Sequence, residues 1–262
     1  MGYVMDYECI KVEEKYEGAV TEITIGPAPA NFLSEQVMYE ISKQLREDEK
    51  NTHKKLILFR GEGDNFGCGA SVEEHKPEKV NEMLPSFHNF ISDLLHYKIP
   101  SIARVKGLCL GGSFEFALAC TFIYADEDSK FAIPEIQLGV FPPVASVLLP
   151  AKGCDQLSSH MILTGEQICA EELERQGVVH AVVETENVEQ LIEEFITKHL
   201  LPKSASSLRL AHTACRAVVA QQYKNFINRI EDLYLGELMS TKDGVEGTMA
   251  FLEKRKPVWQ DA

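Results

Sequence analysis

The sequence lacks an excess of basic residues. Its 262 residues include 26 Lys and Arg against 40 Asp and Glu, so the formal charge at pH 7 is −14. A negative field of this size repels the phosphate backbone of nucleic acids, and no basic stripe along the chain offsets it. The composition therefore excludes broad DNA or RNA binding.

The chain also lacks the cysteine spacing of a disulfide framework. Its seven cysteines are irregularly spaced and include no CxxC pair, so we interpret them as reduced, mostly buried thiols. The N-terminal segment has no basic start followed by an apolar run, as a signal peptide would. The apolar stretch 107–125 has the length of a membrane span but contains three glycines and Glu115. We therefore expect a cytoplasmic protein without a membrane segment.

Common metal and nucleotide motifs are missing as well. There is no HExxH, no GxxxxGK[ST] and no cluster of Cys and His at zinc spacing. Gly61 and Gly63 follow a predicted strand, but the third glycine of a dinucleotide fingerprint is misplaced. We expect no metal ion and no bound nucleotide cofactor.

The order of apolar patterns predicts an α/β fold. The run 55–60 is continuously apolar, which is typical of a parallel sheet buried on both faces. Ser34 is a favourable N-cap for a helix that extends to about residue 47. Further strands are predicted at 9–12, 19–25, 101–105, 122–125 and 178–183, and further helices at 80–99 and 111–120. Beyond a boundary near Lys203 only helical spacing remains, and its apolar stripes are expected to pack on the main domain or on another subunit.

Two glycine-rich segments are candidates for binding a developing negative charge. Residues 67–71 follow a predicted strand, and Gly111, Gly112 and Ser113 open a predicted helix. Small residues allow a ligand to approach the backbone, and free N–H groups at a helix start favour an anion. Two such amides would form an oxyanion hole. The alternative interpretation is that each segment is simply a tight turn.

Two carboxylates lie among apolar neighbours. Glu115 follows Gly112 by about one helical turn between two phenylalanines, and Glu135 lies between Pro134 and Ile136. Burial raises a carboxyl pKa toward the working pH, which suits an acid/base pair acting on one water molecule. The alternatives are a helix-dipole carboxylate for Glu115 and a turn residue for Glu135.

Residues 107–115, 133–139 and 251–256 resemble motifs of the crotonase (enoyl-CoA hydratase/isomerase) superfamily, and the similarity spans nearly the whole chain. The resemblance implies a ββα spiral core at 1–203 and a helical oligomerisation region at 204–262. It also implies a homotrimer or a dimer of trimers. The substrate would be a CoA thioester, with no separate cofactor.

The resemblance also implies roles for individual residues. The amides of Ala70 and Gly112 match the oxyanion hole that polarises the thioester carbonyl, and Glu115 and Glu135 match the two glutamates of hydratases. Cys68, Phe251 and Lys254 are assigned to CoA binding, and the last two match tail residues that, in relatives, reach the nucleotide end across a subunit boundary. The alternative for the tail is a solvated basic helix end.

Segments 66–75 and 139–146 resemble hydratases that act on cyclic dienoyl-CoA esters in anaerobic aromatic degradation. This similarity places Ser71, His75, Phe141 and Pro143 in the substrate pocket. Ser71 replaces a common Asp, Ser113 a glycine, and Pro143 a glycine whose N–H is thereby lost. The alternatives are a straight-chain enoyl-CoA hydratase, an enoyl-CoA isomerase or thioester hydrolase, and a non-catalytic acyl-CoA-binding scaffold.

Overall fold

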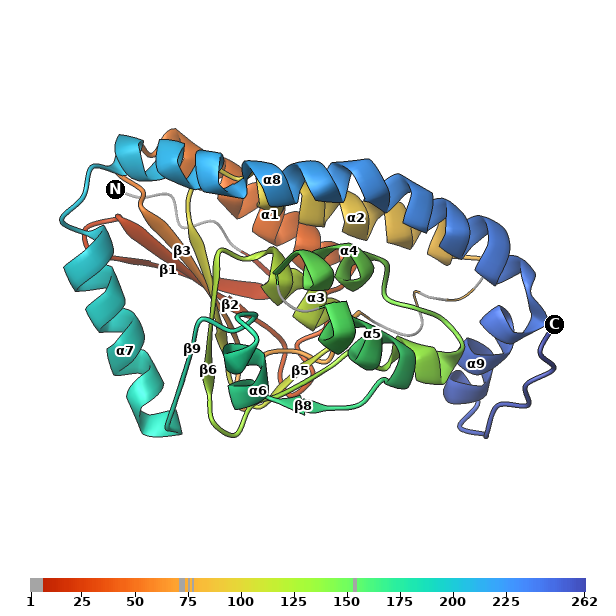
Figure 1. Ribbon diagram of the computed structural model, residues 1–262. Helices are drawn as coiled ribbons and strands as arrows, with labels where there is room; N and C mark the ends of the chain where they lie inside the picture. Colours follow the sequence, from red (N-terminus) through yellow and green to blue (C-terminus); the bar gives the residue numbers. More distant parts are fainter. Residues whose placement is uncertain (1–6, 71–73, 75, 77, 153–154) are drawn as a thin grey trace.

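A computed structural model describes residues 7–70, 74, 76, 78–152 and 155–262, and its main layer is a six-stranded sheet (Figure 1). The strand order is β1 (Ile10–Lys15), β2 (Val20–Ile25), β3 (Leu56–Gly61), β4 (Ser101–Val105), β6 (Phe122–Asp126) and β9 (Ala181–Val183). Only the β1–β2 pair is antiparallel; the other neighbours are parallel. The buried side chains of β3 confirm the parallel sheet predicted from its continuous apolar run.

A second, three-stranded sheet was not predicted. It contains β5 (Leu108–Leu110), β7 (Lys130–Ala132) and β8 (Ile168–Cys169), in that order. Strands of two or three residues are too short to show an alternating pattern. This sheet places the ends of β5 and β7 side by side, and the Gly111 amide donates to the Ala132 carbonyl at 2.9 Å.

Helices cover both sides of this framework (Figure 1). They are α1 (Glu35–Lys50), α2 (Val80–His96), α3 (Gly112–Ala119), α4 (Pro143–Lys152), α5 (Asp155–Thr164), α6 (Ala170–Arg175), α7 (Val188–Phe195), α8 (Ala205–Asp232) and α9 (Lys242–Leu252). As predicted, Ser34 caps α1, and its Oγ accepts from the Val37 amide at 3.3 Å. No helix in the described part of the chain is both long enough and apolar enough to span a membrane.

The long helix α8 runs along one side of the molecule over α1 and α2 (Figure 1). Apolar residues recur at helical spacing over 208–219 and again over 223–233. Both segments belong to α8 and the turn that follows it, since the spacing continues across 219–223. The helix packs against α2 and α4. It continues into a π-helical turn, η5 (Leu233–Glu237), which packs near the start of α2.

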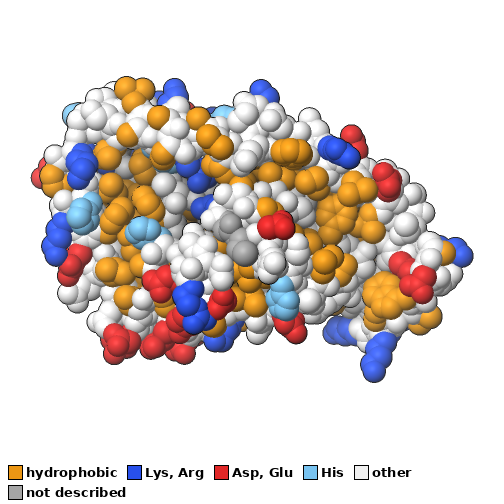
Figure 2. Space-filling view, viewed as in Figure 1, with side chains coloured by type: hydrophobic (Ala, Val, Ile, Leu, Met, Phe, Trp, Pro, Cys, Tyr) orange, Lys and Arg blue, Asp and Glu red, His pale blue; other side chains and the backbone are white. Residues whose placement is uncertain are grey.

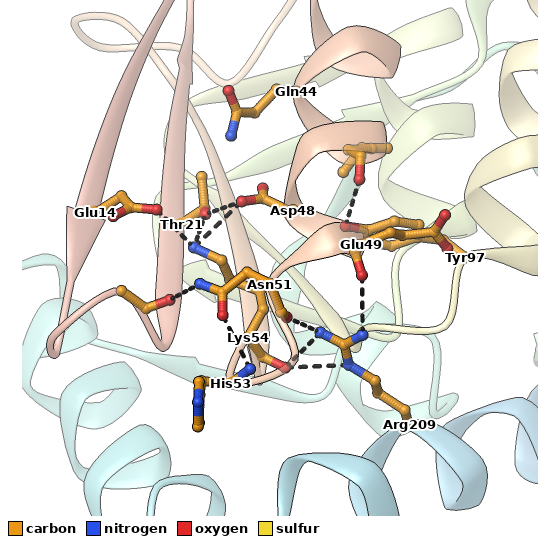
Figure 3. A network of polar contacts seen from close by, with 12 residues as sticks. Glu14, Thr21, Gln44, Asp48, Glu49, Asn51, His53, Lys54, Tyr97 and Arg209 are labelled. Carbon is orange, nitrogen blue, oxygen red and sulfur yellow. Dashed lines mark hydrogen bonds and ion pairs between the residues drawn. The ribbon is translucent and has the colours of Figure 1, made fainter. Parts of the chain in front are cut away.

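A polar network joins the start of α8 to the sheet and to the end of α1 (Figure 3). The Lys54 side chain is fully buried, and its Nζ lies 2.7 Å from Thr21 Oγ1 and 3.2 Å from Asp48 Oδ1. From α8, Arg209 donates to the carbonyl oxygens of Glu49 and Lys54. These bonds satisfy one carbonyl in the last turn of α1 and one beyond it, and they fix the start of the helix whose other end approaches the pocket described next.

Candidate active site

The two glycine-rich segments meet at one place. Gly67 pairs with β5, since its amide donates to Leu108 O and its carbonyl accepts from Leu110 N, both at 3.0 Å. The Gly69 amide donates to Ser113 Oγ at 2.9 Å. Ser113, which departs from the family pattern, therefore ties one glycine segment to the other.

This contact brings the amides of Ala70 and Gly112 together. A Cβ atom built on Gly112 would lie 3.2 Å from the Ala70 nitrogen. The Gly112 amide belongs to the first turn of α3, where N–H groups have no intrahelical acceptor. Neither amide donates to another described residue, so both are free to bind an oxygen that gains negative charge.

Glu115 lies one turn further along α3, and its residue surface is 4% exposed. Its Oε1 accepts from the Ala145 amide of α4 at 2.8 Å. Burial raises the pKa of Glu115 to about 7, although the amides of Ala145 and Val144 lower it. Because Pro143 opens α4, the free amides of that helix start are those of the next residues, which face Glu115.

Glu135 lies on the 3₁₀ turn η2 (Pro134–Leu138), beside the backbone of Gly111. Its Oε2 is buried without a hydrogen-bond partner among the described residues. Burial, followed by the charge of Glu115, raises the pKa of Glu135 well above its usual value. As the pH rises, Glu115 therefore loses its proton before Glu135 does, and this difference between the two carboxyls suits an acid/base pair.

The four groups line a cavity of about 100 Å³. Cys68, Phe141 and Pro143 line it too, so the structure brings these sequence-predicted residues together. The remaining wall consists of mainly apolar side chains that the sequence did not identify: Met83, Leu84, Phe87, Leu138, Val140 and Tyr234. Their spacing along the helices marks them only as apolar positions, and no sequence signal distinguishes pocket from core.

Two predicted groups do not line this cavity in the described chain. Phe251 is 56% exposed at the end of α9, and Lys254 follows that helix. α9 packs against η2 on the outside of the site. Ser71 and His75 lie outside the described residues.

The two sheets, the α3 helix start and the facing carboxylates define a crotonase-fold protein. An enoyl-CoA hydratase from Mycobacterium avium subsp. paratuberculosis K-10 has a similar structure, with a TM-score of 0.84 at 24% identity over 98% of this chain and 100% of that one. A methylmalonyl-CoA decarboxylase in complex with 2-nitronate-propionyl-CoA gives a TM-score of 0.85 at 22% identity over 98% and 100% of the two chains. At such identities the likeness shows the fold.

Sequence similarity identifies the family to which the chain belongs. The enoyl-CoA hydratase/isomerase model matches residues 15–262, and the chain belongs to this family, as its motifs predicted. It is 34% identical over 252 residues to cyclohexa-1,5-dienecarbonyl-CoA hydratase of Thauera aromatica, covering 96% of this chain and 97% of that protein. It is 26% identical over 253 residues to carnitinyl-CoA dehydratase of Escherichia coli K12, covering 93% and 95%. The family acts on acyl-CoA thioesters.

The raised pKa of Glu115 predicts a pH-dependent effect on stability. Because its folded-state pKa of about 7 exceeds its ordinary value of 4.5, the contribution of Glu115 to stability is fully present below pH 4.5 and is lost as the pH rises from there through 7. Glu115→Gln should therefore be more stable than the parent at pH 8, by on the order of 3 kcal/mol. The difference should vanish near pH 4.

Denaturant unfolding at several pH values measures this difference. Glu186→Gln is the matched control, because Glu186 is exposed and its side chain forms no salt bridge with another described residue, so its substitution should leave the pH dependence unchanged. A Glu115→Gln protein whose stability followed that of the parent at every pH would contradict the inferred cost of ionising Glu115.

Proposed function

We propose that the protein is a hydro-lyase that converts cyclohexa-1,5-diene-1-carbonyl-CoA into 6-hydroxycyclohex-1-ene-1-carbonyl-CoA. The observation that carries the proposal is the pair of buried carboxyls facing two free amides across one small, mainly apolar pocket. The Thauera aromatica relative is a cyclohexa-1,5-dienecarbonyl-CoA hydratase by name, which supports the choice of a cyclic dienoyl thioester.

The amides of Ala70 and Gly112 would hold the thioester oxygen as negative charge develops on it. Water attacks the ring carbon C2, which is β to the thioester carbonyl, and an ionised glutamate takes its proton. Because the diene is cross-conjugated, the resulting dienolate extends to C5. Protonation at C5 moves the remaining double bond and completes a 1,4-addition, in which OH is added at C2 and H at C5.

The environments of the carboxyls assign their roles. We assign Glu115 to the base that positions and deprotonates water, since two helix-start amides favour its ionised form. We assign Glu135 to the acid that protonates C5, since burial and the Glu115 charge favour its protonated form. This assignment applies to hydration, and the roles exchange in the reverse reaction.

A direct assay tests the proposed substrate. Purified protein is incubated separately with the cyclic dienoyl-CoA and with crotonyl-CoA, and each product is identified by mass. We expect addition of one water to the cyclic dienoyl-CoA with the higher kcat/KM. A preference for crotonyl-CoA would instead identify a straight-chain enoyl-CoA hydratase, and binding without turnover would identify a scaffold.

The basic tail is proposed to bind the nucleotide end of CoA. Arg255 contacts Glu246 and Glu253, whereas Lys254 forms no salt bridge with another described residue. Lys254→Gln should weaken binding of a CoA ester severalfold at low salt and leave pantetheine thioesters nearly unchanged, because only CoA carries the phosphates. Isothermal calorimetry at two salt concentrations measures both ligands.

Lys50→Gln is the charge-matched control for this substitution, because it removes one exposed positive charge from the end of α1. Equal weakening of CoA and pantetheine esters by Lys254→Gln would overturn the phosphate contact.

We also propose that residues 204–262 form the oligomerisation region of a homotrimer or a dimer of trimers. Apolar side chains cover much of the face seen in Figure 2. On α8, Leu210, Val218 and Phe226 are each more than half exposed. Exposed apolar side chains along one long helix support contact with another subunit.

A further inference from the structure

Tyr234 is a pocket residue that the catalytic scheme above does not use. It lies on the π-helical turn η5, about one hundred residues after the second glutamate, and only 1% of its surface is exposed. Among the described lining residues it is the one that carries a hydroxyl. It lies on a π-helical turn, a feature that occurs often at functional sites.

The phenol ring is firmly held. It packs in an edge-to-face contact with Phe141, with 5.3 Å between ring centroids. Val80, Leu84 and Val140 surround it in one apolar cluster. These contacts fix the direction of the hydroxyl without bonding to it.

The segment that carries Tyr234 is also anchored to α2. One turn earlier, Glu231 Oε2 lies 2.5 Å from Nδ1 of the buried His88. The neighbour of His88, Phe87, lines the pocket. The end of α8 is thus tied to the helix that forms one wall of the site, and the position of Tyr234 is set by two independent contacts.

The hydroxyl itself has no hydrogen-bond partner among the described residues. Burial, together with the charges of Glu135 and Glu115, raises the pKa of Tyr234, so the phenol remains protonated throughout the physiological pH range. A neutral phenol beside two carboxyls is a hydrogen-bond donor, and an apolar pocket strengthens such a bond.

We propose that Tyr234 is a specificity-determining residue whose hydroxyl donates a hydrogen bond to the oxygen that hydration adds to the acyl ring. This inference rests on the proposed function. The other donors near the pocket are already assigned: the amides of Ala70 and Gly112 to the thioester oxygen, and that of Ala145 to Glu115. Glu115 can donate to the added oxygen after taking the proton of the water, and the Tyr234 hydroxyl is the further unassigned donor in the described wall of the pocket.

The hydrogen bond from Tyr234 forms with the product of hydration but not with the substrate. The unsaturated substrate has no ring oxygen, so it gains nothing from Tyr234, whereas the hydroxylated product does. In the dehydration direction the same bond assists departure of the hydroxyl group. Tyr234 keeps its proton in both directions, and the proton transfers remain with the glutamates.

Binding measurements in a Glu135→Gln background test this assignment without turnover. The ligands are 2-hydroxycyclohexane-1-carbonyl-CoA, which has the added oxygen, and cyclohexane-1-carbonyl-CoA, which lacks it. Adding Tyr234→Phe should raise the Kd of the hydroxylated ester about tenfold, the value of one neutral hydrogen bond. The Kd of the ester without the hydroxyl should stay within about twofold, because the ring packing is retained.

Tyr223→Phe is the matched control on the same helix. Tyr223 is buried, does not line the pocket, and donates to the His88 carbonyl at 3.1 Å. Its substitution should lower Tm and leave both Kd values unchanged. An equal change of both Kd values in Tyr234→Phe, or no change in either, would overturn the assignment.

These results are separable from the proposed function. If the parent protein binds both esters but does not hydrate the cyclic dienoyl-CoA, the proposed reaction is wrong, and the difference between the two Kd values still tests the bond from Tyr234. If it hydrates the diene while Tyr234→Phe does not discriminate between the two esters, only the role of Tyr234 is wrong.

Discussion

Glu135→Gln is expected to lower kcat/KM for hydration of the cyclic dienoyl-CoA by on the order of 10³-fold. The amide retains the shape of the carboxyl but has no acidic proton to transfer to ring carbon C5. Because the amide and the protonated carboxyl are both neutral and have the same shape, the substitution leaves the packing of the pocket and the charge beside Glu115 unchanged. Steady-state rates, with product identified by mass, measure the loss.

The matched control is again Glu186→Gln, which makes the same chemical change at an exposed position and should retain full activity. Circular dichroism and Tm establish that both variants fold. If Glu115→Gln and Glu135→Gln both hydrated the diene at the parent rate, the two-carboxyl mechanism would be wrong.

The patterns that predicted the fold correctly are those with a direct physical cause. The continuous apolar run 55–60 is buried on both faces, and it became the parallel strand β3. Ser34 could be recognised as a cap because a serine hydroxyl can accept from an amide of the first helical turn, which has no backbone acceptor. Glu115 and Glu135 could be singled out because a carboxylate between apolar neighbours is expensive to bury unless it has a function.

The segment between Glu135 and the last strand was not predicted. Helix α4 is apolar on nearly every side, since it is packed against α3 and α8. A helix buried all round shows no amphipathic period, and its proline at position 150 argues against a helix. The contact of Ala145 with Glu115 depends on this helix, so it could not be found from local pattern.

Tyr234 was missed for a different reason. Its sequence spacing is that of an ordinary apolar position on a helix, and it reaches the pocket only because α8 crosses the whole molecule (Figure 1). Contacts between residues so far apart in sequence are set by tertiary packing, which no local window contains.

The close approach of Gly111 to Glu135 gives the second large expected effect. Gly111 has φ +49, and a Cβ atom there would lie 2.7 Å from Glu135 Oε1. The backbone cannot easily retreat, because the Gly111 amide bonds to Ala132 O while its carbonyl accepts from Phe114 N and Glu115 N. The carboxyl must therefore move when a methyl group is introduced.

Gly111→Ala should lower kcat by about 10²-fold, because a displacement of the acid by a fraction of an ångström to one ångström spoils proton transfer. The matched control is Gly177→Ala, whose φ is +76 but whose Cβ would meet nothing within 4 Å. Both variants place alanine at positive φ, which costs on the order of 1–3 kcal/mol of backbone strain, and only Gly111→Ala disturbs Glu135. Unfolding curves measure the strain of each variant, and steady-state kinetics measure the effect on catalysis. A Gly111→Ala protein that lost stability as Gly177→Ala does but kept the parent kcat would show that the position of Glu135 is not critical, and the acid would then have to be sought elsewhere in the pocket.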